Sequence, residues 1–221
     1  MRFKAILFDF GGVIVDNETF LNQILADGLS EIGLPTTLED SLRDYSGKRW
    51  AEILPMIEER LGHELPAQFL GQKIAWLSQK VMREFKPVPG IEAFLGMTRH
   101  IPRAIASSSD QIWIKPTLRR FGFLEHFGGH IYGATNLKHA KPHPEVNLLA
   151  AQKLDIAPQD IVTIEDSVSG VQAAIAAGMS AVGLTAASHM RPPDAERLRS
   201  AGAHHIAADY ESVAEWIELS I

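Results

Sequence analysis

Short apolar runs recur along the chain, separated by longer stretches of mixed residues. They lie at Lys4–Phe8, Arg103–Ser107, His130–Tyr132, Ile161–Ile164, Ala181–Leu184 and His205–Ala207. Such runs are typical of strands buried on both faces, and helical patterns lie between most of them. Strands that alternate with helices predict an α/β fold with a doubly wound, Rossmann-like parallel sheet. Ligands of such sheets bind at the carboxyl ends of the strands.

A long gap without a convincing strand separates the first run from the second. Its apolar residues recur at helical spacing instead. The groups that share a helical face are Phe20, Ile24 and Leu25; Trp50, Ile53, Leu54 and Ile57; and Ile74, Leu77 and Val81. The prolines of Lys86–Gly90 end this pattern. We therefore predict a core domain of residues 1–16 and 86–221, with residues 17–85 inserted as a helical cap over the carboxyl ends of the strands.

Composition and charge narrow the class of protein. The 221 residues are 46% hydrophobic and 22% charged, which is typical of a globular protein with a hydrophobic core. A formal net charge of -6, without a basic patch, argues against a nucleic-acid partner. The absence of cysteine excludes disulfides and thiolate chemistry. The sequence shows no signal-peptide pattern or membrane-spanning run, so we expect a cytoplasmic protein without a membrane partner. We also expect a monomer or weak dimer.

Polar clusters follow four of the predicted strands. They are Asp9, Ser107–Ser109, Lys141 and Glu165–Ser167. At one sheet edge they would bring together a nucleophilic carboxylate, hydroxyl groups, a cation and a pair of carboxylates. Clustered carboxylates require a cation, and Mg²⁺ prefers such oxygen ligands together with phosphate. Each cluster alone is typical of a turn, a helix cap or a solvated loop, but the four together indicate phosphoryl transfer through a carboxylate.

The same segments resemble the four motifs of the haloacid dehalogenase-like superfamily of hydrolases, which are mostly Mg²⁺-dependent phosphatases. FDFGGVIVDNE resembles the first motif, IASSS the second, AKPHPEVNLLAAQKL the third and IEDSVSGVQAAIAAGM the fourth. The resemblance covers essentially the whole chain, and the fourth motif points to the β-phosphoglucomutase-like branch with its small helical cap. It implies Mg²⁺-dependent hydrolysis of a small phosphorylated metabolite of the sugar phosphate type.

The resemblance also implies roles for the residues of the clusters. Asp9 is expected to be the nucleophile, and Lys141 and Ser107 complete the expected catalytic set. The phosphoryl group is expected to be bound by Ser107, the amide of Ser108 and Lys141. His139 and His143 flank Lys141 without ligand spacing, and we interpret them as loop residues.

A metal site and a substrate-facing loop are implied in the same way. The expected metal ligands are Asp9, the backbone carbonyl of Gly11, Glu165 and Asp166. In the cap, Lys48 and Arg49 fall where this branch places its substrate-facing loop and are candidates for binding an anionic substrate. A solvated helix start explains these two residues equally well.

Gly11 departs from the family pattern, which has a second aspartate at this position. That aspartate protonates the leaving alcohol and then activates the water that cleaves the aspartyl-phosphate. General acid–base help is typically worth about 10²- to 10⁴-fold, so its loss should weaken both steps. Poor leaving groups such as sugar alkoxides should suffer most, and acyl or aryl phosphates least.

Several functions stay open at this point. The first is a phosphatase that is weakened or uses another proton source. A β-phosphoglucomutase-like phosphotransferase is the second, and Gly11 counts more strongly against it. The third is a phosphonoacetaldehyde hydrolase-like enzyme that cleaves a C–P bond, since such members lack this aspartate and use a cap lysine, here Lys48. A catalytically impaired protein that binds phosphate and metal is the fourth. The 2-haloacid dehalogenases need no metal, and Glu165 and Asp166 argue against them.

Overall fold

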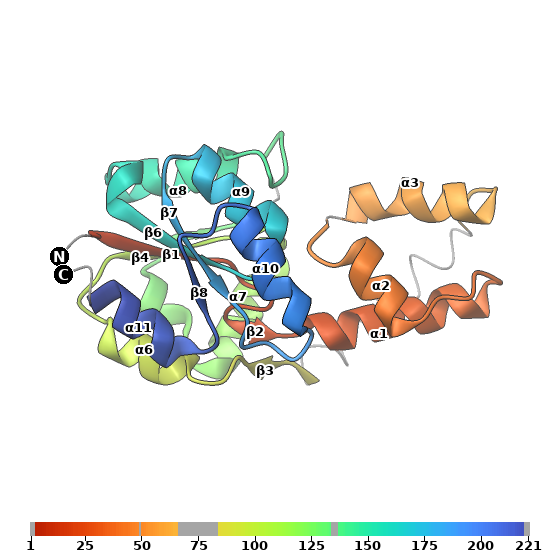
Figure 1. Ribbon diagram of the computed structural model, residues 1–221, viewed down its shortest axis with the longest axis horizontal. Coiled ribbons are helices and arrows are strands. Elements are labelled where there is room, and N and C mark those ends of the chain that lie inside the picture. The colour runs from red at the N-terminus through yellow and green to blue at the C-terminus, as the bar shows by residue number, and fades with distance from the viewer. Residues whose placement is uncertain (1–2, 49, 66–83, 134–136, 219–221) are drawn as a thin grey trace. The chain divides into compact units, whose positions relative to one another are not determined.

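The computed structural model describes residues 3–48, 50–65, 84–133 and 137–218. The chain forms two compact units (Figure 1), one of Met1–Asp16 with Pro87–Ile221 and one of Asn17–Lys86. The last helical group of the sequence pattern, Ile74, Leu77 and Val81, lies outside the described residues. No helix in the described ranges is both long enough and apolar enough to cross a membrane.

A parallel sheet forms the centre of the first unit. Within the described residues it has six strands in the order β5-β4-β1-β6-β7-β8, and every adjacent pair is parallel. Their bounds are β1 Ala5–Phe8, β4 Arg103–Ala106, β5 Ile131–Tyr132, β6 Ile161–Glu165, β7 Ser180–Leu184 and β8 His205–Ala207. The predicted fold class and all the predicted strands are therefore confirmed, with strand ends that differ by no more than one residue.

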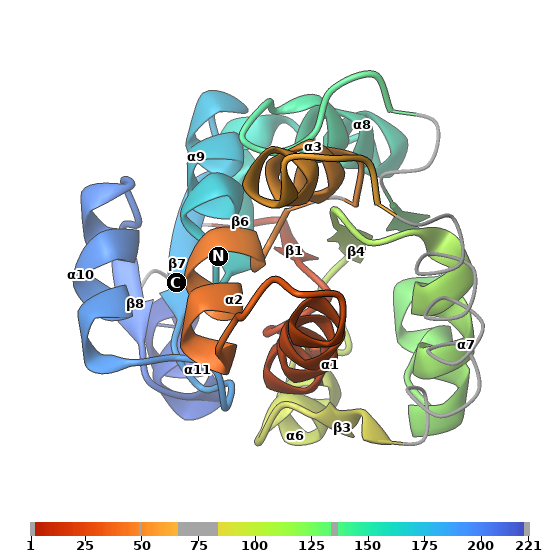
Figure 2. The ribbon, with the colours of Figure 1, turned by 90° about the vertical axis from the view of Figure 1, so that its right-hand side faces the viewer.

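Helices cover both faces of this sheet (Figures 1 and 2). On one face lie α8 (Glu145–Leu154), α9 (Val168–Ala176) and α10 (Pro192–Ser200), and on the other lie α6 (Ile91–Met97) and α11 (Tyr210–Glu218). A further helix, α7 (Gln111–Phe121), packs against β5, and two short 3₁₀ helices lie at Leu124–Phe127 and Pro158–Asp160.

The central strand β1 is apolar on both sides because both sides are covered. Ala5 and Leu7 belong to the buried cluster under α8, α9 and α10. Phe8 points to the opposite face, where its ring meets Phe94 and Phe127 edge-on at centroid distances of 6.0 and 5.8 Å. Successive side chains of a strand point to opposite faces, so a strand covered on both faces reads as a continuous apolar run.

Two very short strands were not predicted. They are β2 (Val15–Asp16) and β3 (Lys86–Pro87), and they pair as a two-stranded sheet. A strand of two residues leaves no hydrophobic period that a sequence pattern could reveal.

The second unit is helical where it is described. Its helices are α1 (Glu18–Glu31), α2 (Leu38–Tyr45) and α3 (Trp50–Leu61). Their shared core contains Leu29, Tyr45, Ile53, Ile57 and Leu65. The predicted helical spacing of Ile53 and Ile57 therefore reflects burial along one face of α3.

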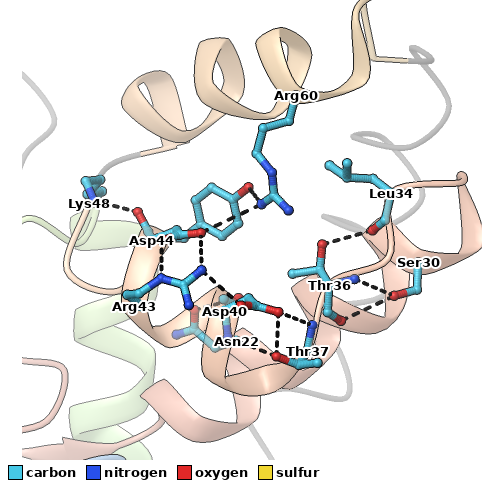
Figure 3. Close-up of polar contacts among 12 residues, drawn as sticks. Asn22, Ser30, Leu34, Thr36, Thr37, Asp40, Arg43, Asp44, Lys48 and Arg60 are labelled. Atoms are coloured by element: carbon cyan, nitrogen blue, oxygen red, sulfur yellow. Dashed lines mark hydrogen bonds and ion pairs between the residues drawn. The ribbon is translucent and has the colours of Figure 1, made fainter.

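Polar contacts join the helices of this unit (Figure 3). Thr37 and Asp40 form a capping box at the start of α2, in which each side chain accepts a hydrogen bond from the other residue's backbone N–H. Asn22 of α1 accepts a hydrogen bond from Ser41 of α2 at 2.8 Å. Arg60 of α3 donates to the Tyr45 hydroxyl at 2.6 Å. Capping therefore fixes the start of α2, and buried polar groups are paired between helices.

Candidate active site

The carboxyl ends of β1, β4 and β6 lie at one level of the sheet. Phe8 of β1 is in register with Ile105 of β4 and Ile164 of β6. Asp9 follows Phe8, and its backbone N–H donates to the Ile164 carbonyl at 3.0 Å. Strand order reverses at β1, which lies between β4 and β6. This edge is therefore the topological switch point, where sheets of this kind bind their ligands.

Lys141 connects these strand ends. Its Nζ donates to Asp9 Oδ1 at 2.8 Å, to Glu165 Oε1 at 2.6 Å and to the Ala106 carbonyl at 2.8 Å. The Lys141 side chain is 2% exposed, and that of Glu165 is 0% exposed. This burial excludes the solvated loop position that a lysine before a proline usually takes. The structure thus brings the predicted residues Asp9 and Glu165 into direct contact with Lys141.

The charges at this edge do not balance. Burial raises the pKa of both Asp9 and Glu165, Lys141 opposes these shifts, and the neighbouring carboxylates add to them. Burial alone would lower the pKa of Lys141, but the charges of Asp9 and Glu165 outweigh it and raise that pKa. Ligand oxygens of Asp9, Glu165 and Asp166 lie within 4.8 Å of one another. One ammonium group thus faces three carboxyl groups, and full ionisation of all three would leave a surplus of negative charge that only a further cation can balance.

These residues fit a divalent cation. Glu165 Oε2 is buried and has no hydrogen-bond partner among the described residues. A buried carboxylate oxygen normally has such a partner, and clustered carboxylate oxygens are the ligands that Mg²⁺ prefers. Two glycines leave room for the acids: a Cβ added to Gly12 would lie 1.7 Å from Asp166 Oδ2, and one added to Gly170 would lie 1.9 Å from Glu165 Oε2. The local backbone therefore accommodates the acid cluster.

The residues of the polar cluster after β4 have different structural roles. Asp110 caps α7, since its side chain accepts a hydrogen bond from the Ile112 N–H at 3.0 Å. Ser107 is buried, its hydroxyl accepts a hydrogen bond from the Ser109 N–H at 3.1 Å, and its nearness to Asp9 acts to lower the pKa of that carboxyl. Ser108 follows it and is half-buried. Helix capping alone therefore does not explain the cluster, because Asp110 caps α7 and Ser107 is buried close enough to Asp9 to affect its pKa.

The cluster after β6 is divided in the same way. Ser167 caps α9 and accepts a hydrogen bond from the Gly170 N–H at 3.0 Å. Glu165 is the last residue of β6, and Asp166 lies between the strand and the cap. Because Ser167 caps the helix, neither carboxylate is needed for capping, and both remain available at the sheet edge.

Gly11 contributes no side chain to this edge. It is buried in the turn after Asp9, where it forms an isolated bridge with Val15. The next amide, that of Gly12, donates to the Val15 carbonyl at 2.8 Å. Gly12 has φ +68°, in the left-handed region that favours glycine, whereas Gly11 is not in that region. The backbone therefore requires glycine at position 12 and not at position 11.

The structure describes one of the two predicted substrate-binding residues of the cap. Lys48 is exposed, and its Nζ donates to the backbone carbonyl of Asp44, as Figure 3 shows. Arg49 lies outside the described residues. Their proposed contact with a substrate stays a prediction.

Two groups with histidine were not predicted as sites. His189 Nε2 lies 3.1 Å from Asp166 Oδ2, with both side chains nearly buried. His189 follows β7, whose carboxyl end lies at the same sheet edge, and that position was the signal the sequence offered. His139, His143 and Glu145 form the second group, with potential ligand atoms within 4.8 Å of one another. The two histidines of this group are exposed.

Comparison with known proteins gives consistent matches. The family described as haloacid dehalogenase-like hydrolase matches residues 6–184. The protein YhcW of Bacillus subtilis is 36% identical over 81% of this chain and 82% of its own. The phosphorylated carbohydrates phosphatase of Thermotoga maritima is 30% identical over 81% of this chain and 83% of its own. A crystal structure of a hydrolase of this family from Deinococcus radiodurans, with bound phosphate and sodium, has a TM-score of 0.81 at 30% identity and covers 99% of this chain and 96% of that one.

Proposed function

This chain belongs to the haloacid dehalogenase-like hydrolase family, and from that premise we propose that it is a phosphatase of a small phosphorylated carbohydrate. The observation that carries the proposal is the contact of Asp9 with Lys141 inside a cluster of carboxylates with surplus negative charge. The relatives named as phosphatases, one of them of phosphorylated carbohydrates, support the substrate class.

In the proposed reaction a carboxylate oxygen of Asp9 attacks phosphorus. The bond from phosphorus to the leaving oxygen breaks, and an aspartyl-phosphate forms. Water then attacks the phosphorus, which releases inorganic phosphate and regenerates Asp9. Ser107, the Ser108 amide and Lys141 bind the phosphoryl oxygens, and Lys141 also holds Asp9 in place. The leaving oxygen requires a proton, and Gly11 cannot supply one.

Mg²⁺ is the proposed cofactor, bound by Asp9, the Gly11 carbonyl, Glu165 and Asp166. When bound, it neutralises charge that develops on the phosphoryl group. The unpaired Glu165 Oε2 and the oxygen-rich donor set support this assignment. A related hydrolase from Deinococcus radiodurans binds phosphate and sodium in its crystal structure, which agrees with a family site for an anion. Residues 17–85 are proposed to act as the cap, with Lys48 and Arg49 selecting an anionic substrate.

Hydrolysis of an aryl phosphate tests the chemistry, because an aryloxide leaves without a strong need for a proton. We expect Mg²⁺-dependent release of phosphate that is abolished in Asp9→Asn, where the isosteric amide is not a nucleophile. Asp160→Asn is the matched control, since Asp160 pairs with the exposed Lys4. Activity that survives Asp9→Asn would refute the assignment of the nucleophile. A panel of phosphorylated carbohydrates, assayed for released phosphate and for phosphate moved to another hydroxyl, then separates hydrolysis from phosphotransfer.

A further inference from the structure

His189 contacts the Asp166 carboxylate from the loop that follows β7. The His189 Nε2 atom lies 3.1 Å from Asp166 Oδ2, and the two side chains are 9% and 7% exposed. An ionised carboxylate only accepts hydrogen bonds, so at this distance the imidazole N–H donates to Oδ2. In such a nearly buried corner of the site, water competes only weakly with this contact.

Hydrogen bonds on both sides of His189 fix the loop that carries it. On one side, the Asp16 carboxylate accepts hydrogen bonds from the Ser188 N–H at 3.2 Å and from the Ser188 hydroxyl at 2.8 Å. On the other side, the Met190 N–H donates to the Ala187 carbonyl at 3.1 Å. The donor beside Asp166 is therefore held in place by its own loop and does not depend on the contact with Asp166 for its position.

The Asp166 side chain belongs to no regular element, since it lies between β6 and the Ser167 cap of α9. A carboxylate with one oxygen held has its plane and its second oxygen fixed as well. Asp166 offers a ligand oxygen within 4.8 Å of those of Asp9 and Glu165. An oriented ligand loses less freedom when an ion binds, so the hydrogen bond from His189 should favour binding although its nitrogen is not a ligand.

We propose that His189 is a positioning residue of the cation site, which holds Asp166 Oδ2 through its Nε2–H and thereby orients that carboxylate for the ion. The proposal rests on the proposed cation site and adds to it a residue that sets the affinity. Because the hydrogen bond acts on Asp166 and not on the ion, its loss should weaken the binding of Mg²⁺ and Mn²⁺ alike.

Two amide variants test this role with closely matched side chains. His189→Gln keeps an N–H close to the position of Nε2, whereas the side chain of His189→Asn is one methylene shorter and does not reach Oδ2. Isothermal titration of the metal-free protein with Mg²⁺ and with Mn²⁺ is the measurement. We expect His189→Asn to lower both affinities by about 10- to 100-fold, as is typical when the hydrogen-bond partner of a metal ligand is lost. His189→Gln should stay close to the wild-type protein.

Two controls separate positioning from a general structural role. His100→Asn makes the same change at an exposed histidine in the turn after α6 and should alter neither affinity. Thermal unfolding with a chelator present should show the same melting temperature for His189→Gln and His189→Asn. Loss of loop packing would instead lower the melting temperature in His189→Asn and leave the affinity for either ion unchanged, which would overturn the proposal.

The remaining outcomes separate this proposal from the function on which it rests. Equal losses of affinity in His189→Gln and His189→Asn would overturn it, because the two differ in whether a donor reaches Oδ2. A loss for Mn²⁺ without a loss for Mg²⁺ would also overturn it, because it would indicate direct contact of the imidazole with the ion. In both cases the cation site stands. If neither ion binds the wild-type protein, the proposed cation site is itself wrong, and the role of His189 fails with it.

Discussion

Replacing Lys141 by methionine tests the charge arrangement of the site. Methionine keeps the length of the side chain and removes the ammonium group. Asp9 and Glu165 then lose a partner at 2.8 and 2.6 Å, and the Ala106 carbonyl loses a hydrogen bond at 2.8 Å. The Glu165 side chain is fully buried, so water cannot replace the missing contact without opening the site.

The expected effect follows from these distances. At an effective dielectric constant of about 20, each ammonium–carboxylate attraction at this range is worth about 6 kcal/mol, and desolvation of the ions offsets much of it. Removing one partner of a buried pair destabilises by about 3–5 kcal/mol, because an uncompensated charge stays behind. For a chain of this size, each kcal/mol lowers the melting temperature by about 2–4 °C. We therefore expect a melting temperature lower by about 6–20 °C.

Thermal unfolding followed by circular dichroism, with a chelator present, is the measurement. Lys153→Met is the matched control, since Lys153 is exposed on α8. The double variant Lys141→Met/Glu165→Gln should regain part of the loss, because it also removes the stranded charge. Mg²⁺ should raise the melting temperature of Lys141→Met more than that of the wild-type protein, because the surplus of negative charge is larger. A Lys141→Met protein that melts within about 2 °C of the wild-type protein would refute this account.

Three further predictions concern the turn after β1, the acid cluster and the helical unit. Gly11→Asp should raise turnover of sugar phosphates by about 10²- to 10⁴-fold and that of aryl phosphates less; unchanged sugar phosphate turnover would mean that another group already supplies the proton. Gly170→Ala should destabilise by about 1–3 kcal/mol in chemical unfolding, because its Cβ would overlap Glu165 Oε2, whereas Gly96→Ala, with free space around it, should not. Hydrogen bonds from Thr37 lower the pKa of Asp40 to about 2, so the stabilising effect of the Asp40 carboxylate is present above pH 4 and is lost as the pH falls towards 2. The variant Asp40→Asn should therefore lose less helical signal in circular dichroism over that pH range than the wild-type protein. An equal decline in both proteins would contradict this reasoning.

The sheet could be predicted from sequence because its strands are covered on both sides. Burial of Ile6 and Leu7 on opposite faces produces the continuous apolar run, and the same holds for β4 and β6. Parallel strands then bring their carboxyl ends to one edge. This rule alone predicts that Asp9 and Glu165 lie together, although 156 positions of sequence separate them. At the opposite ends of the same two strands, Lys4 pairs with Asp160, which is also 156 positions away.

The division of tasks inside each cluster could not be predicted in the same way. Asp110 and Ser107 are both polar residues after one strand, and the sequence does not reveal that one caps α7 while the other lies close to Asp9. His189 was missed because its place depends on Asp16, which holds the neighbouring Ser188 across 172 positions of sequence. A long-range hydrogen bond of this kind leaves no periodic pattern.

Gly11 changes two properties of the site at once. It removes a proton donor, and it also removes a negative charge from an edge where three carboxylates already face one ammonium group. A fourth carboxylate at this edge would strengthen the attraction for a cation, so the glycine weakens that attraction. The glycine also slows the departure of an alkoxide, because it supplies no proton. Reaction in this chain, with glycine at position 11, should therefore depend strongly on the leaving group and moderately on the cation. A steep dependence of turnover on the acidity of the leaving alcohol, flattened in Gly11→Asp, is the kinetic signature that follows from this geometry.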